Sequence, residues 1–230
     1  MSGQKQQGVP HPYFPRGVSI PHYVPNDRPL LEILGLFFSL VGVVLFVTWV
    51  YSTRRRLGVT DRLIVCWFVV CGGIHSILEG YFSLYHDTLA GSSSYLAQMW
   101  KEYGKGDSRY ITSDTFTVCM ETITAVIDGP LSLLTAHAIL NHAPHRYFLQ
   151  LTVSLCQLYG DSLYYMTEIR EGFKHGELWH PLHFWFYFVF LNAFWIIIPL
   201  TLIGQAGKRI SQSQSLYDKD RRTNSKKKSK

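Results

Sequence analysis

Long apolar blocks dominate this 230-residue sequence and restrict the folds that it can adopt. A bilayer requires about 20 consecutive apolar residues of a spanning helix, and the backbone polar groups of such a segment must bond within the helix. Five blocks of suitable length occur, at 30–51, 63–85, 116–140, 147–165 and 182–203. The sequence therefore predicts an all-α, polytopic membrane protein with five transmembrane helices that enclose an intramembrane cavity.

Basic residues predict the orientation of this bundle. No Lys or Arg lies inside an apolar block, and 14 of the 22 fall in the segments 52–62, 141–146 and 204–230. Cytosolic loops are enriched in Lys and Arg, so we expect a lumenal N-terminus and a cytosolic C-terminus. Three parts follow: a lumenal Pro-rich lead-in at 1–29, a membrane domain at 30–206 and a basic cytosolic tail at 207–230.

The net charge of +6 comes from the tail alone. Residues 208–230 contain nine Lys or Arg and two Asp, a balance of +7, which leaves −1 for the other 207 residues. A basic tail on a neutral body favours contact with anionic membrane lipid and excludes a nucleic-acid-binding surface. The last four residues, Lys-Lys-Ser-Lys, resemble the dilysine signal of endoplasmic-reticulum membrane proteins, so we expect that location.

Two segments outside the blocks have a distinct composition. The lead-in holds six of the ten prolines, which predicts an irregular conformation. Between 86 and 112, apolar residues recur at helical spacing beside charged ones, as in Leu96, Met99, Trp100 and Tyr103. This spacing predicts a short amphipathic helix at the membrane face.

Polar residues recur on one face of several predicted spans. The stripes are His75 and Glu79; Thr117, Glu121, Thr124 and Asp128; Ser154, Gln157, Asp161 and Tyr164; and Trp185, Phe188, Asn192 and Trp195. Packing between helices accounts for Thr117, Ser154 and Gln157, and a local network with Tyr159 and Tyr164 accounts for Asp161.

Glu79 and Glu121 are harder to explain by packing, because an acid near mid-span costs about 2.5–3.5 kcal/mol by insertion scales. With no basic residue in the spans, these acids must meet each other, meet His75 or stay protonated. A neutral carboxyl donates a proton and an ionised one accepts it. The pattern predicts proton transfer on an apolar substrate inside the cavity.

This chemistry requires no cofactor, and the sequence contains no Gly-rich phosphate loop and no H-E-x-x-H motif. Two histidine pairs, His142/His145 and His180/His183, lie on opposite sides of the predicted membrane and cannot share a site. The four cysteines have no C-x-x-C spacing. We therefore expect no metal and no cofactor.

Five strings make a specific resemblance visible: GGIHSILEGYFSLY at 72–85, WKEYGKGDSRY at 100–110, FTVCMETITA at 116–125, YGDSLYY at 159–165 and HPLHFWFYFVFLNAFW at 180–195. In this order they closely resemble the emopamil-binding protein family, the sterol Δ8–Δ7 isomerases of the five-helix EXPERA group. The resemblance extends from about residue 11 to about residue 203. Asp128 departs from the family pattern.

The resemblance implies an enzyme that moves a sterol double bond from C8=C9 to C7=C8. The implied route is protonation at C9, a carbocation at C8 and proton loss from C7. Residues that match those implicated in the family are His75, Glu79, Glu121, Thr124, Asn192 and Trp195. We expect Glu79, beside His75, to supply the proton and Glu121, oriented by Asn192 and Thr124, to be its carboxylate partner, although sequence leaves open which acid donates.

The remaining expectations concern ligands. Trp195 would face the cation, and the substrate would contact Trp100, Tyr103, Tyr110 and Trp185. The implied partners are a sterol of the zymostenol or zymosterol type, cationic amphiphilic amines and membrane lipid, and a homodimer stays open. The alternative functions are a non-catalytic sterol or drug receptor of the same family and a sterol transporter, which would not require paired acids.

Overall fold

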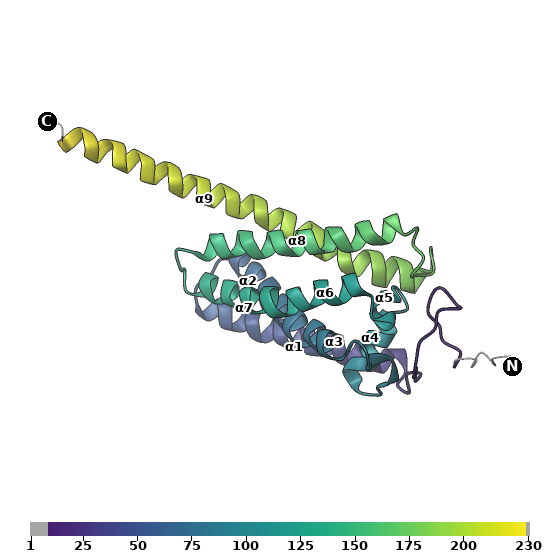
Figure 1. Cartoon of the computed structure of the whole chain (residues 1–230). Coiled ribbons are helices and arrows are strands. Elements are labelled where there is room, and N and C mark those ends of the chain that lie inside the picture. The colour runs from purple at the N-terminus through teal and green to yellow at the C-terminus, as the bar shows by residue number, and fades with distance from the viewer. Residues whose placement is uncertain (1–8, 229–230) are drawn as a thin grey trace, which may run out of the picture.

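The computed structural model describes residues 9–228, and all regular structure in that range is helical. Five long helical rods run side by side, and three short helices lie at one end of the bundle (Figure 1). The rods are α1 (Leu30–Arg54); α2 (Val59–Gly73), η1 (Ile74–Glu79) and α3 (Gly80–Tyr85); α6 (Thr115–Ile123), η3 (Thr124–Asp128) and α7 (Gly129–Leu140); α8 (Arg146–Arg170); and η4 (Pro181–Leu191) with α9 (Asn192–Lys228). The short helices are η2 (Leu89–Gly91), α4 (Tyr95–Tyr103) and α5 (Arg109–Thr112).

The predicted all-α membrane fold is confirmed, but the count of five spans is not. Within the described residues, four rods are long and apolar enough to cross a bilayer: Leu30–Arg54, Val59–Tyr85, Thr115–Leu140 and Pro181–Lys226. The fifth rod, α8, has 25 residues but is less apolar, since it carries Gln150, Gln157 and Asp161. The fifth span therefore stays a prediction.

Two apolar clusters hold the bundle together, one toward each end. Phe82, Trp100, Tyr110, Tyr164 and Phe188 belong to the cluster beneath the short helices. Leu57, Val65, Phe68, Val153 and Leu202 belong to the other. The rods are thus packed firmly at both ends, and the space between the clusters is where a cavity can persist.

The short helices form a cap over one end of the bundle, which differs from the predicted amphipathic helix at the membrane face. α4 is present and is capped by Ser94 Oγ, which accepts from Ala97 N at 3.3 Å. Its charged residues Lys101 and Glu102 are buried, however, not exposed to solvent. The periodicity of apolar residues predicted α4 correctly. It could not show that the lead-in covers the polar side of this helix.

The lead-in is irregular, as predicted, and it packs against α4. Tyr13 and Tyr23 are buried, and Tyr13 donates a hydrogen bond to Lys101 O at 3.0 Å. The Lys101 ammonium donates to Val24 O at 2.7 Å, and burial lowers the pKa of this group. Residues 9–29 and α4 therefore stabilise each other.

The C-terminal part of α9 extends beyond the bundle as an exposed helix, at the end opposite the cap (Figure 1). The basic tail predicted at 207–230 is thus helical through Lys228. Residues 229 and 230, which complete the dilysine-like sequence, lie outside the described residues, as do residues 1–8 of the lead-in.

Arg109 is a buried cation in the cap, with 2 % of its surface exposed. Its guanidinium donates to both oxygens of Asp107, at 3.0 and 2.9 Å from Nε, and to Thr167 Oγ1 at 2.7 Å. Glu168 Oε2 lies 3.6 Å from Nε. One planar cation therefore joins α5 to the end of α8, a geometry that a lysine ammonium cannot reproduce.

Replacing Arg109 by lysine should strongly destabilise the protein. Asp107 and Glu168 would remain buried without their bidentate partner, which costs about 3–5 kcal/mol in comparable sites. Thermal unfolding in detergent should show a melting temperature lower by roughly 6–20 °C for a chain of this size. Arg28→Lys is the matched control, since Arg28 pairs with Glu32 on the exposed surface and should change little. Equal melting temperatures for the two variants would contradict this role of Arg109.

Candidate functional site

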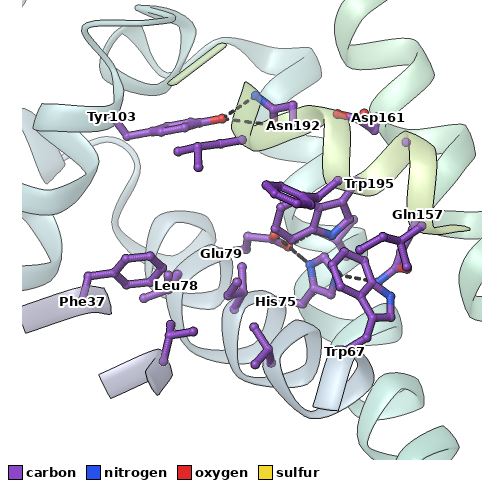
Figure 2. A pocket seen from close by; sticks show the side chains of 18 of the residues that line it. Phe37, Trp67, His75, Leu78, Glu79, Tyr103, Gln157, Asp161, Asn192 and Trp195 are labelled. Atoms are coloured by element: carbon purple, nitrogen blue, oxygen red, sulfur yellow. Dashed lines mark hydrogen bonds and ion pairs between the residues drawn. The ribbon is translucent and has the colours of Figure 1, made fainter. Parts of the chain in front are cut away.

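A partly open cavity of about 740 Å³ lies between the rods, and residues of the cap helices α4 and α5 line one end of it. Its wall is mainly apolar, with aliphatic and aromatic side chains from α1, α2 and α9. The polar groups on the wall come from η1, η3, α6, α8 and α9, and Figure 2 shows several of them pointing into the same space. A cavity is therefore present between the helices, as predicted, but it is partly open.

Three π-helical segments bring residues to this cavity: η1, η3 and η4. Single π-helical turns are rare in proteins and occur frequently at functional sites. Pro130 lies two residues after the end of η3 and has no N–H to continue an α-helical ladder, and Pro181 begins η4. Pro130 therefore explains locally why the rod of α6, η3 and α7 departs from α-helical geometry, whereas a proline at the first position, such as Pro181, is compatible with an α-helix.

Small residues let the η1 and η3 segments approach each other. A Cβ on Gly129 would lie 2.3 Å from Ser76 Oγ and 3.0 Å from Ser76 N, so a larger residue does not fit. A Cβ on Gly72 would likewise collide with Leu133. This close approach places the polar residues of the two segments within hydrogen-bonding distance of each other.

His75 and Glu79 form a buried pair on η1. The ring nitrogen Nδ1 lies 2.7 Å from both carboxyl oxygens of Glu79, and the two residues are 3 % and 9 % exposed. On the other side of the ring, Gln157 Nε2 donates to His75 Nε2 at 3.2 Å (Figure 2). With Nε2 as acceptor, Nδ1 carries the proton and donates it to Glu79.

Thr124 connects this pair to the second acid. Its Oγ1 lies 2.5 Å from Glu79 Oε2 and 3.0 Å from the main-chain oxygen of Glu121. Thr124 belongs to η3 and Glu121 to the preceding α6, whose first turn is capped by Asp114. The predicted grouping of His75, Glu79, Glu121 and Thr124 is therefore seen in the structure.

Glu121 is buried, with 5 % exposure, and its Oε1 accepts a hydrogen bond from Tyr110 at 2.6 Å. Tyr110 stands on α5 in the cap, where its ring stacks on Trp100 with centroids 4.8 Å apart. Burial, together with the nearby charge of Glu121, raises the pKa of the Tyr110 hydroxyl, so this group stays a donor.

Asn192 occupies a different place from the one expected. Its Nδ2 donates to Tyr103 OH at 2.9 Å and to Phe188 O at 2.8 Å, and Tyr103 OH donates to Asn192 Oδ1 at 3.2 Å. The hydrogen-bond partner of the Glu121 carboxyl is Tyr110, and no contact of Asn192 with Glu121 is found in the described part of the chain. Asn192 lines the cavity and fixes the cap to α9, but it does not orient Glu121.

Aromatic residues complete the wall near His75. The Trp195 ring lies 6.2 Å from the His75 ring and 5.5 Å from that of Trp67. Trp100, Tyr103 and Tyr110 also line the cavity, as predicted. Trp185 does not: it is 49 % exposed and contacts Trp179 and Phe184 on the outer side of η4. The predicted face through Trp185 and Asn192 assumed α-helical spacing, which the π-helix breaks.

Several residues of the cavity were not predicted from the sequence to belong to the site. Gln157, assigned to packing, contacts His75, and Trp67 and Asp161 line the cavity. The polar stripe on 154–164 contained the signal for Gln157 and Asp161. Asp128 is buried at 2 % exposure but is absent from the cavity wall.

Two groups of side chains in the described residues have the composition of metal ligands: Glu177, His180 and His183, and Asp107, Glu168 and His175. Neither group shares a residue with the cavity wall. The second is held by Arg109, and His180 Nδ1 of the first accepts from His183 N at 3.1 Å to cap η4. The polar groups that line the cavity include carboxyl, imidazole, amide and hydroxyl groups.

Comparison with known proteins identifies the family. Residues 95–206 match the model of EXPERA, the expanded EBP superfamily. The chain is 52 % identical over 211 residues to a 3-beta-hydroxysteroid-Δ(8),Δ(7)-isomerase of Rattus norvegicus, which covers 90 % of this chain and 92 % of the relative. The corresponding protein of Cavia porcellus is 46 % identical over 92 % of this chain and 93 % of its own length.

A more distant relative is an isomeliandiol synthase of Ailanthus altissima, 36 % identical over 81 % of this chain and 86 % of its own length. Together with the family model, these relatives establish that the chain belongs to the EXPERA superfamily and, within it, to the 3-beta-hydroxysteroid-Δ8,Δ7-isomerase family.

Proposed function

We propose that this chain is a sterol isomerase that moves the C8=C9 double bond of a 3β-hydroxysterol to C7=C8 without a cofactor. The observation that carries the proposal is the presence of two buried carboxyls, Glu79 and Glu121, on the wall of one mainly apolar cavity, each with its own hydrogen-bond partners. The names of the relatives at 46–52 % identity support the same reaction. The cavity volume lies within the range of about 300–1,000 Å³ typical of small-molecule sites.

Glu79 supplies the proton to C9. The Thr124 hydroxyl has one hydrogen and two neighbouring acceptors, Glu79 Oε2 and Glu121 O. In the starting state proposed here, the hydroxyl donates to Glu121 O, and the protonated carboxyl of Glu79 donates to Thr124 Oγ1. The His75 Nδ1–H donates to the same carboxyl and stabilises the anion that remains after the proton has left.

Glu121 accepts the proton that leaves C7. The Tyr110 hydroxyl, which stays protonated, donates to its carboxylate and holds it in place before the proton arrives. One proton enters the sterol and one leaves, so the reaction needs no oxidant or reductant. Return of the proton from Glu121 to Glu79 restores the starting state.

The intermediate is a carbocation at C8, and the cavity is suited to it. Trp195 presents an aromatic ring beside His75, and cation–π contacts are worth about 2 kcal/mol or more when water is excluded. The apolar wall keeps water away from the carbocation. Water that reached it would add to C8 and form an alcohol.

The same features suit cationic amphiphilic amines, which resemble the intermediate in charge and shape.

The substrate is a sterol of the zymostenol or zymosterol type. The chain resides among the lipids of the endoplasmic reticulum membrane. Its cap is lumenal and the basic end of α9 is cytosolic, in line with the positions of Lys and Arg. A homodimer is compatible with the apolar outer face of α1.

The rival function is a non-catalytic sterol or drug receptor. Such a protein would need the apolar cavity but not two acids with separate hydrogen-bond partners, each of which is costly to bury. The separate environments of Glu79 and Glu121 therefore favour the enzyme.

Removal of either carboxyl should abolish most of the activity. Purified protein, a Δ8 sterol and deuterated water should yield the Δ7 sterol with deuterium at C9. Glu79→Gln and Glu121→Gln should each lower kcat by about 10²–10⁴-fold, since each removes one proton-transfer group. Glu32→Gln, a change at an exposed carboxylate, is the control and should retain wild-type rates. Absence of both Δ7 product and deuterium with the wild-type chain would refute the enzyme.

Ammonium compounds with bulky apolar groups should bind in the cavity. The wild-type chain should bind such an amine at least about tenfold more tightly than the Glu79→Gln/Glu121→Gln double variant, a difference of about 1.4 kcal/mol. The uncharged carbon isostere of the amine should show no such difference, because it lacks the charge that a carboxylate attracts. Equal affinity of the amine for both proteins would exclude the shared site.

A further inference from the structure

Asp161 is an acid on the cavity wall that the reaction described above does not use. It lies on α8 beside Gly160, and its Oδ2 is buried without a hydrogen-bond partner among the described residues. The local network expected with its tyrosine neighbours is not observed: Tyr159 is 66 % exposed, and Tyr164 OH has no hydrogen-bond partner in the same part of the chain. A ligand in the cavity can supply the partner that Asp161 lacks.

Three residues expected to contact the substrate already have hydrogen-bond partners within the protein. Trp100 Nε1 donates to Leu78 O at 2.9 Å, Tyr103 OH is paired with Asn192, and Tyr110 OH donates to Glu121. Each polar tip in the cap therefore has a partner from the protein itself. A substrate hydroxyl could donate to the phenol oxygens there, but it would find no free donor among these three residues.

The other wall atoms without a partner in the described residues suit a hydroxyl less well. Trp67 and Trp195 offer only an indole N–H, and Gln157 Oε1 offers only an acceptor. All three side chains lie beside the reacting groups around His75. The Tyr164 ring is 2 % exposed and is packed inside the cap cluster. A carboxyl can accept a hydrogen bond from a hydroxyl and, when protonated, can also donate one to it.

Asp161 is placed at a suitable distance from the reacting groups. It lies four residues, about one helical turn, along α8 from Gln157, whose side chain contacts His75. Glu79 belongs to η1, on another wall of the cavity (Figure 2). A Cβ on the adjacent Gly160 would meet no atom within 4 Å, so there is open space next to the carboxyl.

The distribution of polar and apolar residues along the cavity also favours a sterol whose hydroxyl points toward Asp161. Its other end is lined by Leu45, Leu63, Ile198 and Leu202, which suit the apolar side chain of a sterol. The 3β-hydroxyl is on ring A, one ring away from the B/C junction at which the double bond moves. With the B/C junction beside Glu79, a sterol whose side chain occupies the apolar end can direct its hydroxyl toward α8.

We propose that Asp161 is the substrate-binding residue for the 3β-hydroxyl and thereby selects 3-hydroxysterols over sterols without this group. This inference rests on the proposed function, because it takes a sterol as the occupant of the cavity. Asp161 contributes to recognition and positioning, whereas the proton transfers belong to Glu79 and Glu121.

The test compares a Δ8 sterol with its 3-deoxy analogue on the purified full-length protein. Asp161→Leu should raise KM for the 3β-hydroxysterol by about tenfold or more, equivalent to about 1.4 kcal/mol, and leave kcat nearly unchanged. It should not change KM for the 3-deoxy sterol, which never made the contact. Asp161→Asn, which keeps an accepting oxygen and donors, should retain most of the affinity for the hydroxysterol.

Asp128→Asn is the matched control, because Asp128 is a buried acid outside the cavity wall and should not alter the preference between the two sterols. Equilibrium binding of both sterols is measured beside turnover, with a melting temperature for each variant. If the wild-type protein binds the 3β-hydroxysterol more tightly than the 3-deoxy sterol but converts neither, the proposed function is refuted and the role of Asp161 in binding the hydroxyl is supported. An equal change for both sterols, or a fall in kcat alone, would overturn the role of Asp161 in hydroxyl binding.

Discussion

The burial of two carboxyl groups between membrane-spanning helices is the constraint on which the rest of this structure depends. No Lys or Arg lies within the apolar blocks, so these acids have no cation nearby on their own helices. Their partners are an imidazole on η1, a hydroxyl on η3 and a phenol on α5. An unsatisfied buried polar group costs about 1–3 kcal/mol, more when it is charged, so the helices that supply these partners must be docked together for the site to exist.

Departure from regular α-helix is the means by which the bundle brings these groups together. Gly129 permits contact between η1 and η3, and Pro130 interrupts the α-helical ladder at the same depth. A π-helical turn inserts an extra residue per turn and so redirects the side chains that follow. The π-helical geometry of η4 leaves Trp185 on the outside of the bundle. The residues Asn192 and Trp195, which follow η4 on α9, line the cavity.

Sequence reasoning succeeded where one physical rule governed the outcome. Apolar length predicted the helical membrane fold, and the cost of burying acids singled out Glu79, Glu121 and His75, which the structure brings together. It failed where tertiary contacts decide. The burial of Lys101 depends on a lead-in about 77 residues away in sequence, and the displacement of Trp185 depends on a π-helix that hydrophobic periodicity does not reveal. Gln157 was correctly placed on a polar stripe, but only the packing of α8 shows that it contacts His75.

The cap is where stability and chemistry meet. Tyr110, which holds the carboxyl of Glu121, immediately follows Arg109, whose guanidinium fixes α5 to the end of α8. Ser108, one residue earlier, donates a hydrogen bond to the main-chain oxygen of Phe14 and so ties α5 to the lead-in as well. A loosened cap would therefore move the donor to Glu121 and admit water to the cavity at the same time. Because electrostatic interactions weaken steeply as water enters, the ion pairs of the cap protect the geometry of acids that they never touch.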